Sequence, residues 1–402
     1  MTAVGPGGLP RRKEPIYRPN LPLFGAIFLC LLGVGASLGV LPFYVVQQFG
    51  GSKVEVGVVV AAIAVAAVLG RPVAGRIADR RGYQPVMLAG AVCCALSGLG
   101  YLAAGNIAEL TAVRILNGVG EGAVYTAGAA WLVMLCPPQR RGRVVGLYGI
   151  HMWLGITLGA GLGTIVMRAS GFTAVWLVCA AAGALGFGSI LLMPRPPIPE
   201  QPGTRIRLSS FFPVSTLIPG TALSLASLGY AALAAFVALD MASRGVANGI
   251  IALNAYGAAY VGVRLVIGNL PDRLGPHRIA VWSALVEAAG LVMVAVATNL
   301  AVAVIGGLVM GTGLSLLFPS LALLVINRTE ASQQGAALGA FTSFWDIGVA
   351  VGGPLAGLVA TISYPAIFWV MAGCAVLSAG LSASGMRRPK PVPAPSGATM
   401  RT

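Results

Sequence analysis

Long apolar runs fill most of this 402-residue chain, and short polar segments separate them. Most runs reach the length of roughly 17 to 25 residues that an α-helix needs to cross a bilayer. They are continuous and rich in Ala, Gly, Val and Leu, whereas strands of a membrane barrel alternate apolar and polar residues over about ten positions. Backbone groups inside a bilayer must pair within helices or a closed barrel. The pattern therefore predicts an all-α membrane protein.

Twelve transmembrane helices are predicted from these runs. We expect them at residues 21–46, 54–75, 84–104, 107–135, 144–167, 172–193, 214–239, 249–270, 279–298, 300–326, 335–359 and 365–385. The composition agrees, because 57% of the residues are hydrophobic and only 9% are charged. A soluble domain carries roughly 25% charged residues. The chain has too little charge to form a soluble surface.

The net charge of +15 is distributed unevenly along the chain. Basic residues gather in alternate loops, at 11–13, 76–81, 140–143, 194–209, 273–278 and 386–390, while the opposite loops hold only Lys53, Arg168 and Arg244. This asymmetry predicts a multi-pass protein of the cytoplasmic (inner) membrane with both termini in the cytoplasm. No aromatic-interleaved basic patch is present, so we expect no nucleic-acid partner.

Residues that could support enzymatic or metal chemistry are scarce. The six cysteines lie within or at the ends of apolar runs, and their spacing fits no metal site. The chain has two histidines and carries no HExxH, P-loop or GxSxG motif. We therefore expect no enzyme activity, no cofactor and no metal.

A charged stretch, GRIADRRGY at 75–83, recurs in similar form as GNLPDRLGPH at 268–277. A shift of 193 residues places Gly75, Asp79, Arg80 and Gly82 on Gly268, Asp272, Arg273 and Gly275. The same shift aligns several other glycines, which predicts two pseudo-symmetric six-helix halves in the same membrane orientation. The expected organisation is a cytoplasmic tail (1–20), an N-terminal bundle (21–193), a cytoplasmic linker (194–213), a C-terminal bundle (214–386) and a second cytoplasmic tail (387–402).

Four motifs within this duplicated plan resemble those of the major facilitator superfamily. GRIADRRG is similar to the loop between that family's second and third helices, and RILNGVGEG at 114–122 to its fourth-helix motif. GITLGAGLG at 155–163 resembles the fifth-helix Gly-x-x-x-Gly-Pro motif of antiporters, with Ala160 in place of the proline. GVAVGGPLAG at 348–357 is the corresponding element of the second half. The chain looks most like bacterial drug- and arabinose-efflux permeases, a branch of twelve-helix proton antiporters.

The resemblance implies roles for the repeated loops and the glycine motifs. Both copies of the loop would act as cytoplasmic gates, in which Asp79 accepts hydrogen bonds from a helix end and pairs with a nearby arginine. Gly75 and Gly82 would permit close approach and turn geometry. Small residues four apart let helices pack closely in lipid. We expect Gly155, Gly159 and Gly163 to face the helix at 249–270, and Gly348 and Gly352 to face the helix at 54–75. Pro354 is part of the same helix-packing motif.

Ionisable residues inside the predicted helices are costly, at about 3 kcal/mol each near the bilayer centre. Arg114, Asn117, Glu121 and Tyr125 recur at spacings of three and four, so they share one stripe of the helix at 107–135. The resemblance places that helix beside a central cavity. Glu121 is the first candidate for proton coupling, because burial favours a carboxyl's neutral form. The alternative is a structural acid paired with an arginine of another helix.

The other charged residues inside the predicted membrane helices are expected to have different roles. Asp346 is the second proton-coupling candidate, and it could instead serve gating by bonding Arg71. Arg71 and Arg264 lie near helix ends, where arginine side chains can extend to the interface, so neither is expected to be a strong substrate ligand. Glu287 is expected to be a paired structural acid. Tyr230 and Phe318 join Arg114, Asn117 and Tyr125 as candidates for the cavity and substrate site.

Together these features predict a secondary active transporter that exports a small organic solute or drug in exchange for protons by alternating access. A proton symporter or facilitator that imports a small metabolite is the alternative, and a transport-incompetent membrane sensor is a remote one. The expected partners are a small-molecule substrate, protons and the lipid bilayer, and the chain is expected to act as a monomer. No motif identifies the substrate.

Overall fold

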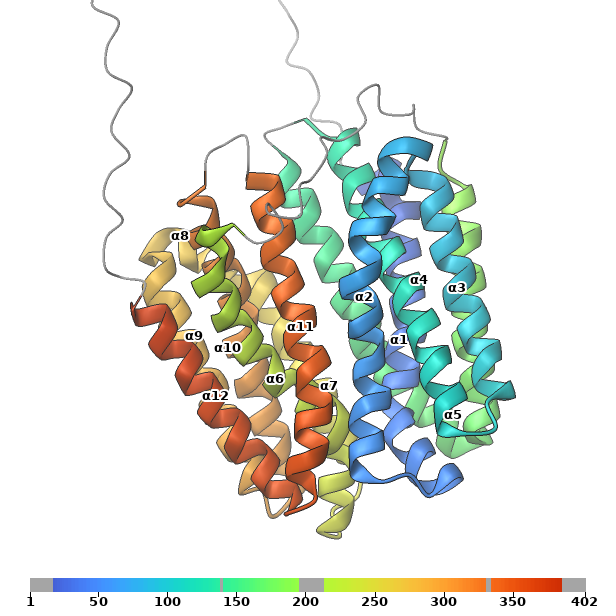
Figure 1. The fold of residues 1–402 in the computed structure, drawn as a ribbon, viewed down its shortest axis with the longest axis vertical. Helices are drawn as coiled ribbons and strands as arrows, with labels where there is room; N and C mark the ends of the chain where they lie inside the picture. The colour runs from blue at the N-terminus through green and yellow to red at the C-terminus, as the bar shows by residue number, and fades with distance from the viewer. Residues whose placement is uncertain (1–16, 138–139, 195–212, 330–333, 385–402) are drawn as a thin grey trace, which may run out of the picture.

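The computed structural model describes residues 17–137, 140–194, 213–329 and 334–384, and the described residues form twelve helices and no strand (Figure 1). The first half contains α1 (Tyr17–Phe49), α2 (Lys53–Arg81), α3 (Tyr83–Ala103), α4 (Ile107–Leu135) and α5 (Arg141–Leu191). The second contains α6 (Val214–Ser243), α7 (Ile250–Ile267), α8 (Leu270–Leu274), α9 (Pro276–Ala295), α10 (Leu300–Ile326), α11 (Gln334–Ala360) and α12 (Tyr364–Ser384). Most of the predicted linker and both predicted tails lie outside the described residues.

The predicted number of membrane crossings is confirmed. Ten of these helices are long and apolar enough to cross a membrane, and α4 adds a span of 29 residues that carries three charged side chains. Helix α5 covers two predicted helices, because it reverses direction at Gly171, whose φ of 78° lies in the left-handed region. The predicted helix at 249–270 ends earlier, at Ile267, and the short α8 follows it.

The two halves lie side by side as separate bundles (Figure 1). In the first half α1 packs on α5, and α4 packs on α2 and α3. In the second half α6 packs on α11 and α12, and α10 packs on α7 and α9. The halves meet mainly where α2 contacts α11 and where α5 contacts α7. We call the end at which α1 begins and α12 ends the open end, and the opposite end the closed end.

The expected partners of the two glycine stripes were wrong. A Cβ on Gly155 or Gly159 would meet α1, at Phe28, Leu31 and Leu32, rather than the helix that begins at residue 250. Gly163 likewise lies against Ala36 of α1.

The second glycine stripe, on α11, also packs against a helix of its own half. Gly348 faces Ser224 and Ser227 of α6, and Gly352 faces Leu228 and Ala231 of the same helix. Both stripes thus hold helices together within a half.

Contacts between the halves use the neighbouring faces of the same helices. Gly353 and Gly57 approach each other backbone to backbone where α11 crosses α2, and Pro354 follows directly. Toward the closed end, Lys53 donates a hydrogen bond of 2.8 Å to the carbonyl of Ala360 and lies 4.4 Å from the ring centroid of Tyr364. These contacts seal the closed end between α2 and the α11–α12 turn.

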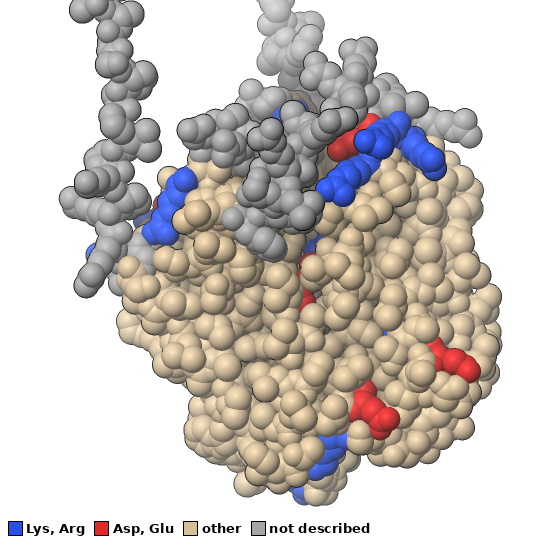
Figure 2. All heavy atoms as spheres, viewed as in Figure 1, with Lys and Arg blue, Asp and Glu red and all other residues tan. Residues whose placement is uncertain are grey.

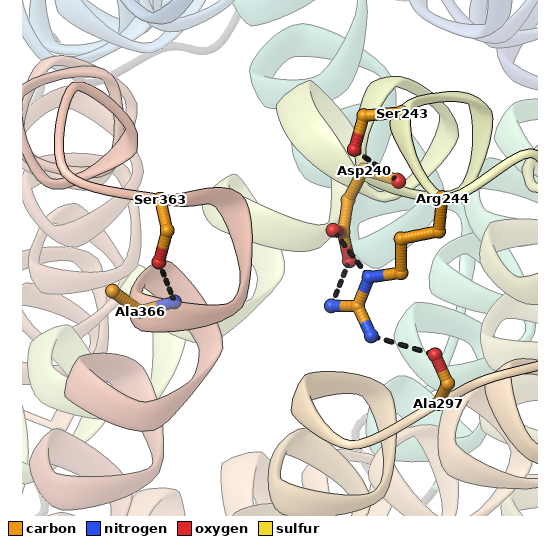
Figure 3. A network of polar contacts seen from close by, with 6 residues as sticks. All are labelled: Asp240, Ser243, Arg244, Ala297, Ser363 and Ala366. Carbon is orange, nitrogen blue, oxygen red and sulfur yellow. Dashed lines mark hydrogen bonds and ion pairs between the residues drawn. The ribbon is translucent and has the colours of Figure 1, made fainter.

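Charged side chains are distributed as a membrane protein requires. The broad middle of the visible face carries almost no charged atoms, which gather toward its two ends (Figure 2). At the closed end, Arg244 donates to both carboxylate oxygens of Asp240, at 2.8 and 2.7 Å, and to the carbonyl of Ala297 at 2.6 Å (Figure 3). This bidentate pair compensates a carboxylate that has no exposed surface.

Candidate functional site

A cavity of about 560 Å³ lies between the two halves. Its lining includes the first turns of α5 and α11, the last turns of α10, and Asp272 of α8, all of which lie at the open end. Deeper in the cavity, α2 and α4 form one wall, and α6, α7 and α11 form the other. A solute can therefore reach the middle of the bundle from the open end, while the α2–α11 contact closes the opposite end.

Three charged side chains form an ion cluster in this cavity: Glu121, Arg71 and Asp346. Arg71 of α2 donates to Glu121 of α4 across 3.2 Å. The same guanidinium lies 3.0 Å from Asp346 of α11, as an ion pair without hydrogen-bond alignment. The three side chains are 17%, 11% and 6% exposed for Arg71, Glu121 and Asp346 respectively. One guanidinium of the N-terminal half thus joins an acid of its own half to an acid of the other half.

Arg71 is therefore in a different place from the one expected. Instead of extending toward the membrane interface, its guanidinium turns into the cavity and lies 4.9 Å from the ring centroid of Tyr125. The two carboxylates attract it more strongly than interfacial water, because ion pairs gain strength in apolar surroundings. The alternative expectations for Glu121 and Asp346, each paired with an arginine of another helix, match this geometry.

Aromatic side chains pack together where the two halves face each other. Trp153 of α5 lies 4.3 Å from Tyr260 and 5.4 Å from Tyr230, measured between ring centroids. Trp345 of α11 lies 5.5 Å from Tyr230 and 5.9 Å from Trp153. We call these four residues, Trp153, Tyr230, Tyr260 and Trp345, the aromatic cluster; all four line the cavity. Only Tyr230 had been predicted as a cavity residue.

Arg264 of α7 also lines the cavity. It donates to the hydroxyl of Tyr260 at 3.2 Å and to the carbonyl of Ser315 at 3.5 Å. Its guanidinium carbon lies 5.9 Å from the Tyr260 ring and 5.8 Å from the Phe318 ring. The expectation that this arginine extends away from the site was wrong, and the predicted cavity residue Phe318 lies beside it.

Two other predicted cavity residues belong to a hydrogen-bond network inside the N-terminal half, and one of them, Arg114, is also among the cavity-lining residues. Arg114 has no exposed surface, and its guanidinium donates to Ser37, Tyr101 and Asn117 and to carbonyls of α2 at distances of 3.1 to 3.5 Å. Asn117 donates to Ser97 at 2.7 Å and is not among the cavity-lining residues. This network fastens α4 to α1, α2 and α3, so it stiffens the wall that carries Glu121.

Glu287 differs from its expected role as a paired acid. Its side chain in α9 has no exposed surface, and neither carboxyl oxygen has a hydrogen-bond partner among the described residues. A charge in such surroundings costs far more than a neutral carboxylic acid. Glu287 lies outside the cavity, which makes it a useful control residue.

The two repeated segments at the open end are mostly helical rather than loops, because Gly75, Asp79 and Arg80 lie in α2, and Asp272 and Arg273 lie in α8. Gly82 and Gly275, which are repeat counterparts, both have a φ of 92°, a conformation that favours glycine. Gly75 shows no close approach, because a Cβ there would find its nearest neighbour 3.7 Å away. No ion pair or hydrogen bond joins Asp79 to another residue in the described part of the chain, and Asp272 lines the cavity mouth. The expected gating contact is thus not formed in this open arrangement.

Within the described ranges, no group of three or more His, Cys, Asp or Glu side chains could hold a metal ion. The site instead offers ion pairing, aromatic packing and titratable carboxyls. These groups can bind a solute and a proton, and no nucleophile–base pair accompanies them in the cavity lining.

Comparisons with known proteins agree with this architecture. The chain matches the Major Facilitator Superfamily over residues 23–241 and 220–401. The MFS-type transporter YhhS of Escherichia coli O6:H1, described as uncharacterized, is 34% identical over 405 residues, covering 96% of this chain and 99% of the relative.

Solved structures share the fold at low sequence identity. The crystal structure of the nucleoside transporter NupG has a TM-score of 0.71 at 16% identity, over 92% of this chain and 99% of that chain. The human organic anion transporter MFSD10 has a TM-score of 0.68 at 18% identity, over 92% of this chain and 100% of that chain. From the matched family, the similar relatives and the twelve-span fold, we conclude that this chain belongs to the Major Facilitator Superfamily and is a multi-pass membrane transporter rather than an enzyme.

Proposed function

We propose that the chain exports a small organic solute or drug in exchange for protons, by alternating access to the central cavity. The observation that carries this proposal is the ion cluster, in which Arg71 joins Glu121 of one half to Asp346 of the other inside the cavity. A proton bound by Asp346 removes one of the charges that hold the halves in this arrangement. Proton binding and movement of the halves thereby become linked.

The two acids have different positions in this scheme. Glu121 and Arg71 belong to the same half, so they move together when the halves rock. Asp346 belongs to the other half, so its distance from Arg71 changes with the state of the transporter. Neutralising Asp346 weakens the joint between the halves, whereas neutralising Glu121 leaves Arg71 more strongly attracted to Asp346.

The direction of transport and the orientation in the membrane rest on sequence features. The segments 71–82 and 118–122 resemble those of efflux permeases of the drug and arabinose type. The positive-inside asymmetry would place both termini, and with them the open end, in the cytoplasm of a bacterial cell. A cavity open on that side can take up solute from within, and one chain holds the complete cavity, so a monomer suffices.

Import by proton symport or facilitated diffusion is the second candidate. The observation in its favour is Ala160, which occupies the position of the antiporter motif's proline. The same cavity and the same carboxyls would then carry solute and proton in one direction.

Proteoliposomes separate these candidates. Vesicles that contain a pH-sensitive dye and pooled organic solutes are diluted into solute-free buffer, and lumenal pH is recorded. Export in exchange for protons acidifies the lumen as solute leaves, whereas symport makes it more alkaline. Solute release without any pH change identifies a facilitator, and the absence of both solute release and pH change contradicts a transport function for these solutes.

A further inference from the structure

We propose that Arg264 is an anion-binding subsite of the cavity, and that the transported solute is an organic carboxylate with a flat apolar body. This inference rests on the proposed role of the cavity as the transport site, and it names the class of solute that the cavity accepts. It follows from a difference between the two halves of the repeat.

Arg71 and Arg264 are counterparts under the shift of 193 residues, and their surroundings correspond. Arg71 lies 4.9 Å from the ring of Tyr125, and Arg264 lies 5.8 Å from the ring of Phe318, which is the counterpart of Tyr125. Both guanidinium groups line the cavity. The two arginines therefore occupy equivalent positions on opposite walls.

Their partners differ in charge. Arg71 is held by Glu121 and Asp346, whereas the counterparts of these two acids are Leu314 and Trp153. No acid among the described residues forms an ion pair with Arg264. The repeat thus replaces both carboxylates beside Arg264 with apolar side chains.

Arg264 lies in the last turn of α7 without an ion-pair partner among the described residues, and its donors are largely unused. A guanidinium has five N–H donors in a planar fork that matches a carboxylate. Arg264 uses one terminal nitrogen, Nη1, for contacts of 3.2 Å to Tyr260 and 3.5 Å to Ser315. Its remaining donors are available to the cavity, and ionisable groups kept inside membrane proteins generally serve function. A carboxylate of the solute supplies the counter-charge that the protein omits.

The surfaces beside Arg264 define the rest of the solute. Tyr260 and Phe318 flank the guanidinium, and Trp153 lies 4.3 Å from Tyr260. Trp345 and Tyr230 continue this apolar wall toward Asp346. Aromatic faces favour flat apolar groups over flexible polar ones. A carboxylate attached to an aromatic ring can pair with the Arg264 guanidinium while its ring packs on the aromatic side chains.

Binding to the purified full-length protein tests this assignment without requiring transport. Isothermal titration at about pH 8, where carboxylates are ionised, compares benzoate, 1-naphthoate and indole-3-acetate with their uncharged carboxamides. We expect at least one carboxylate to bind about tenfold or more tightly than its amide, as a charge-assisted bidentate contact implies. Arg264→Gln is expected to reduce that preference to about twofold or less, and Arg264→Lys to keep part of it.

Two controls make the outcome decisive. Arg168→Gln removes an exposed arginine at the closed end and is expected to leave the preference unchanged. Unaltered amide binding by Arg264→Gln shows that the cavity is still folded. The proposal is overturned if no carboxylate binds more tightly than its amide, or if the preference survives in Arg264→Gln. Carboxylate binding without solute-coupled proton movement would contradict the proposed proton coupling and leave this subsite intact.

Discussion

The ion pair between Arg71 and Asp346 leads to a quantitative prediction about conformational balance. Asp346→Asn removes one charge of the pair while keeping the side chain's size. At the observed 3.0 Å, Coulomb's law with an effective dielectric constant of about 20 gives about 5.5 kcal/mol of gross attraction. Desolvation of both groups offsets most of that energy. Arg71 also keeps Glu121 and is partly in contact with water.

We therefore expect the substitution to destabilise the conformation seen here, in which the cavity is accessible from the open end, by about 1–2 kcal/mol. The population ratio of this conformation to the one in which that access is closed then falls by about 5- to 30-fold. Spin labels at Val145→Cys and Thr342→Cys report this ratio, because both positions line the cavity, one in each half. The six native cysteines are replaced first. Electron–electron distance distributions should shift toward shorter separations in Asp346→Asn.

Acidification tests the role of the Arg71–Asp346 pair independently. In the parent protein, protonation of Asp346 should produce the shift that Asp346→Asn produces at neutral pH, and in the variant the acid response should largely disappear. Asp272→Asn is the matched control, because Asp272 also lines the cavity but forms no ion pair within the described residues. An unchanged distance distribution in Asp346→Asn, or a shift of equal size in Asp272→Asn, would contradict a role of the Arg71–Asp346 pair in stabilising this arrangement.

Three further predictions concern the closed end and its supports. Gly353→Leu, placed where α11 touches α2, should reduce transport by about tenfold or more by keeping the helices apart, whereas Gly373→Leu, which meets open space, should transport normally. Arg244→Gln should lower stability in detergent by about 2 kcal/mol or more, read from thermal unfolding, because it leaves the buried Asp240 carboxylate without its cation; an unchanged midpoint would contradict this. Lys53→Met should raise the rate at which thiol reagents label the closed end about fivefold, since one charge-assisted hydrogen bond to the carbonyl of Ala360 is lost. An unaltered labelling rate would contradict a sealing role for Lys53.

Much of the architecture could be predicted because lipid restricts the choices. The apolar runs predicted the helices to within a few residues at most ends, since a bilayer leaves few alternatives to continuous helices. The duplicated motif predicted the two halves. The break predicted between residues 167 and 172 coincides with the reversal at Gly171, where a single left-handed glycine takes the place of a loop.

The glycine stripes were harder to interpret. Helix α11 carries Gly348 and Gly352 on one face and Gly353 and Gly357 on the adjoining face, and both faces pack closely. Spacing predicts that a helix will cross there, but it does not indicate which neighbour crosses. The partner depends on how each helix is rotated within its bundle, which is decided by all of its contacts together.

The acidic residues of the candidate site could be predicted from the sequence, but the arginine and aromatic residues around them could not. Glu121 and Asp346 are conspicuous because few charges occur in these runs, and both line the cavity. Arg71 was misjudged because distance from the helix end does not reveal which way a long side chain turns. Trp153 and Trp345 gave no signal of their own, since aromatic residues in membrane helices usually face lipid or the core.

The role of the ion cluster in proton coupling is tested most directly by the solute-coupled proton flux of three carboxyl variants in proteoliposomes. The ion cluster predicts that Glu121→Gln and Asp346→Asn each abolish the flux seen with the parent protein, because both acids hold Arg71 in the cavity. Glu287→Gln should retain that flux, because Glu287 is buried outside the cavity. Flux that survives in both cluster variants, or that is lost only in Glu287→Gln, would contradict the central claim that this cluster couples protons to transport.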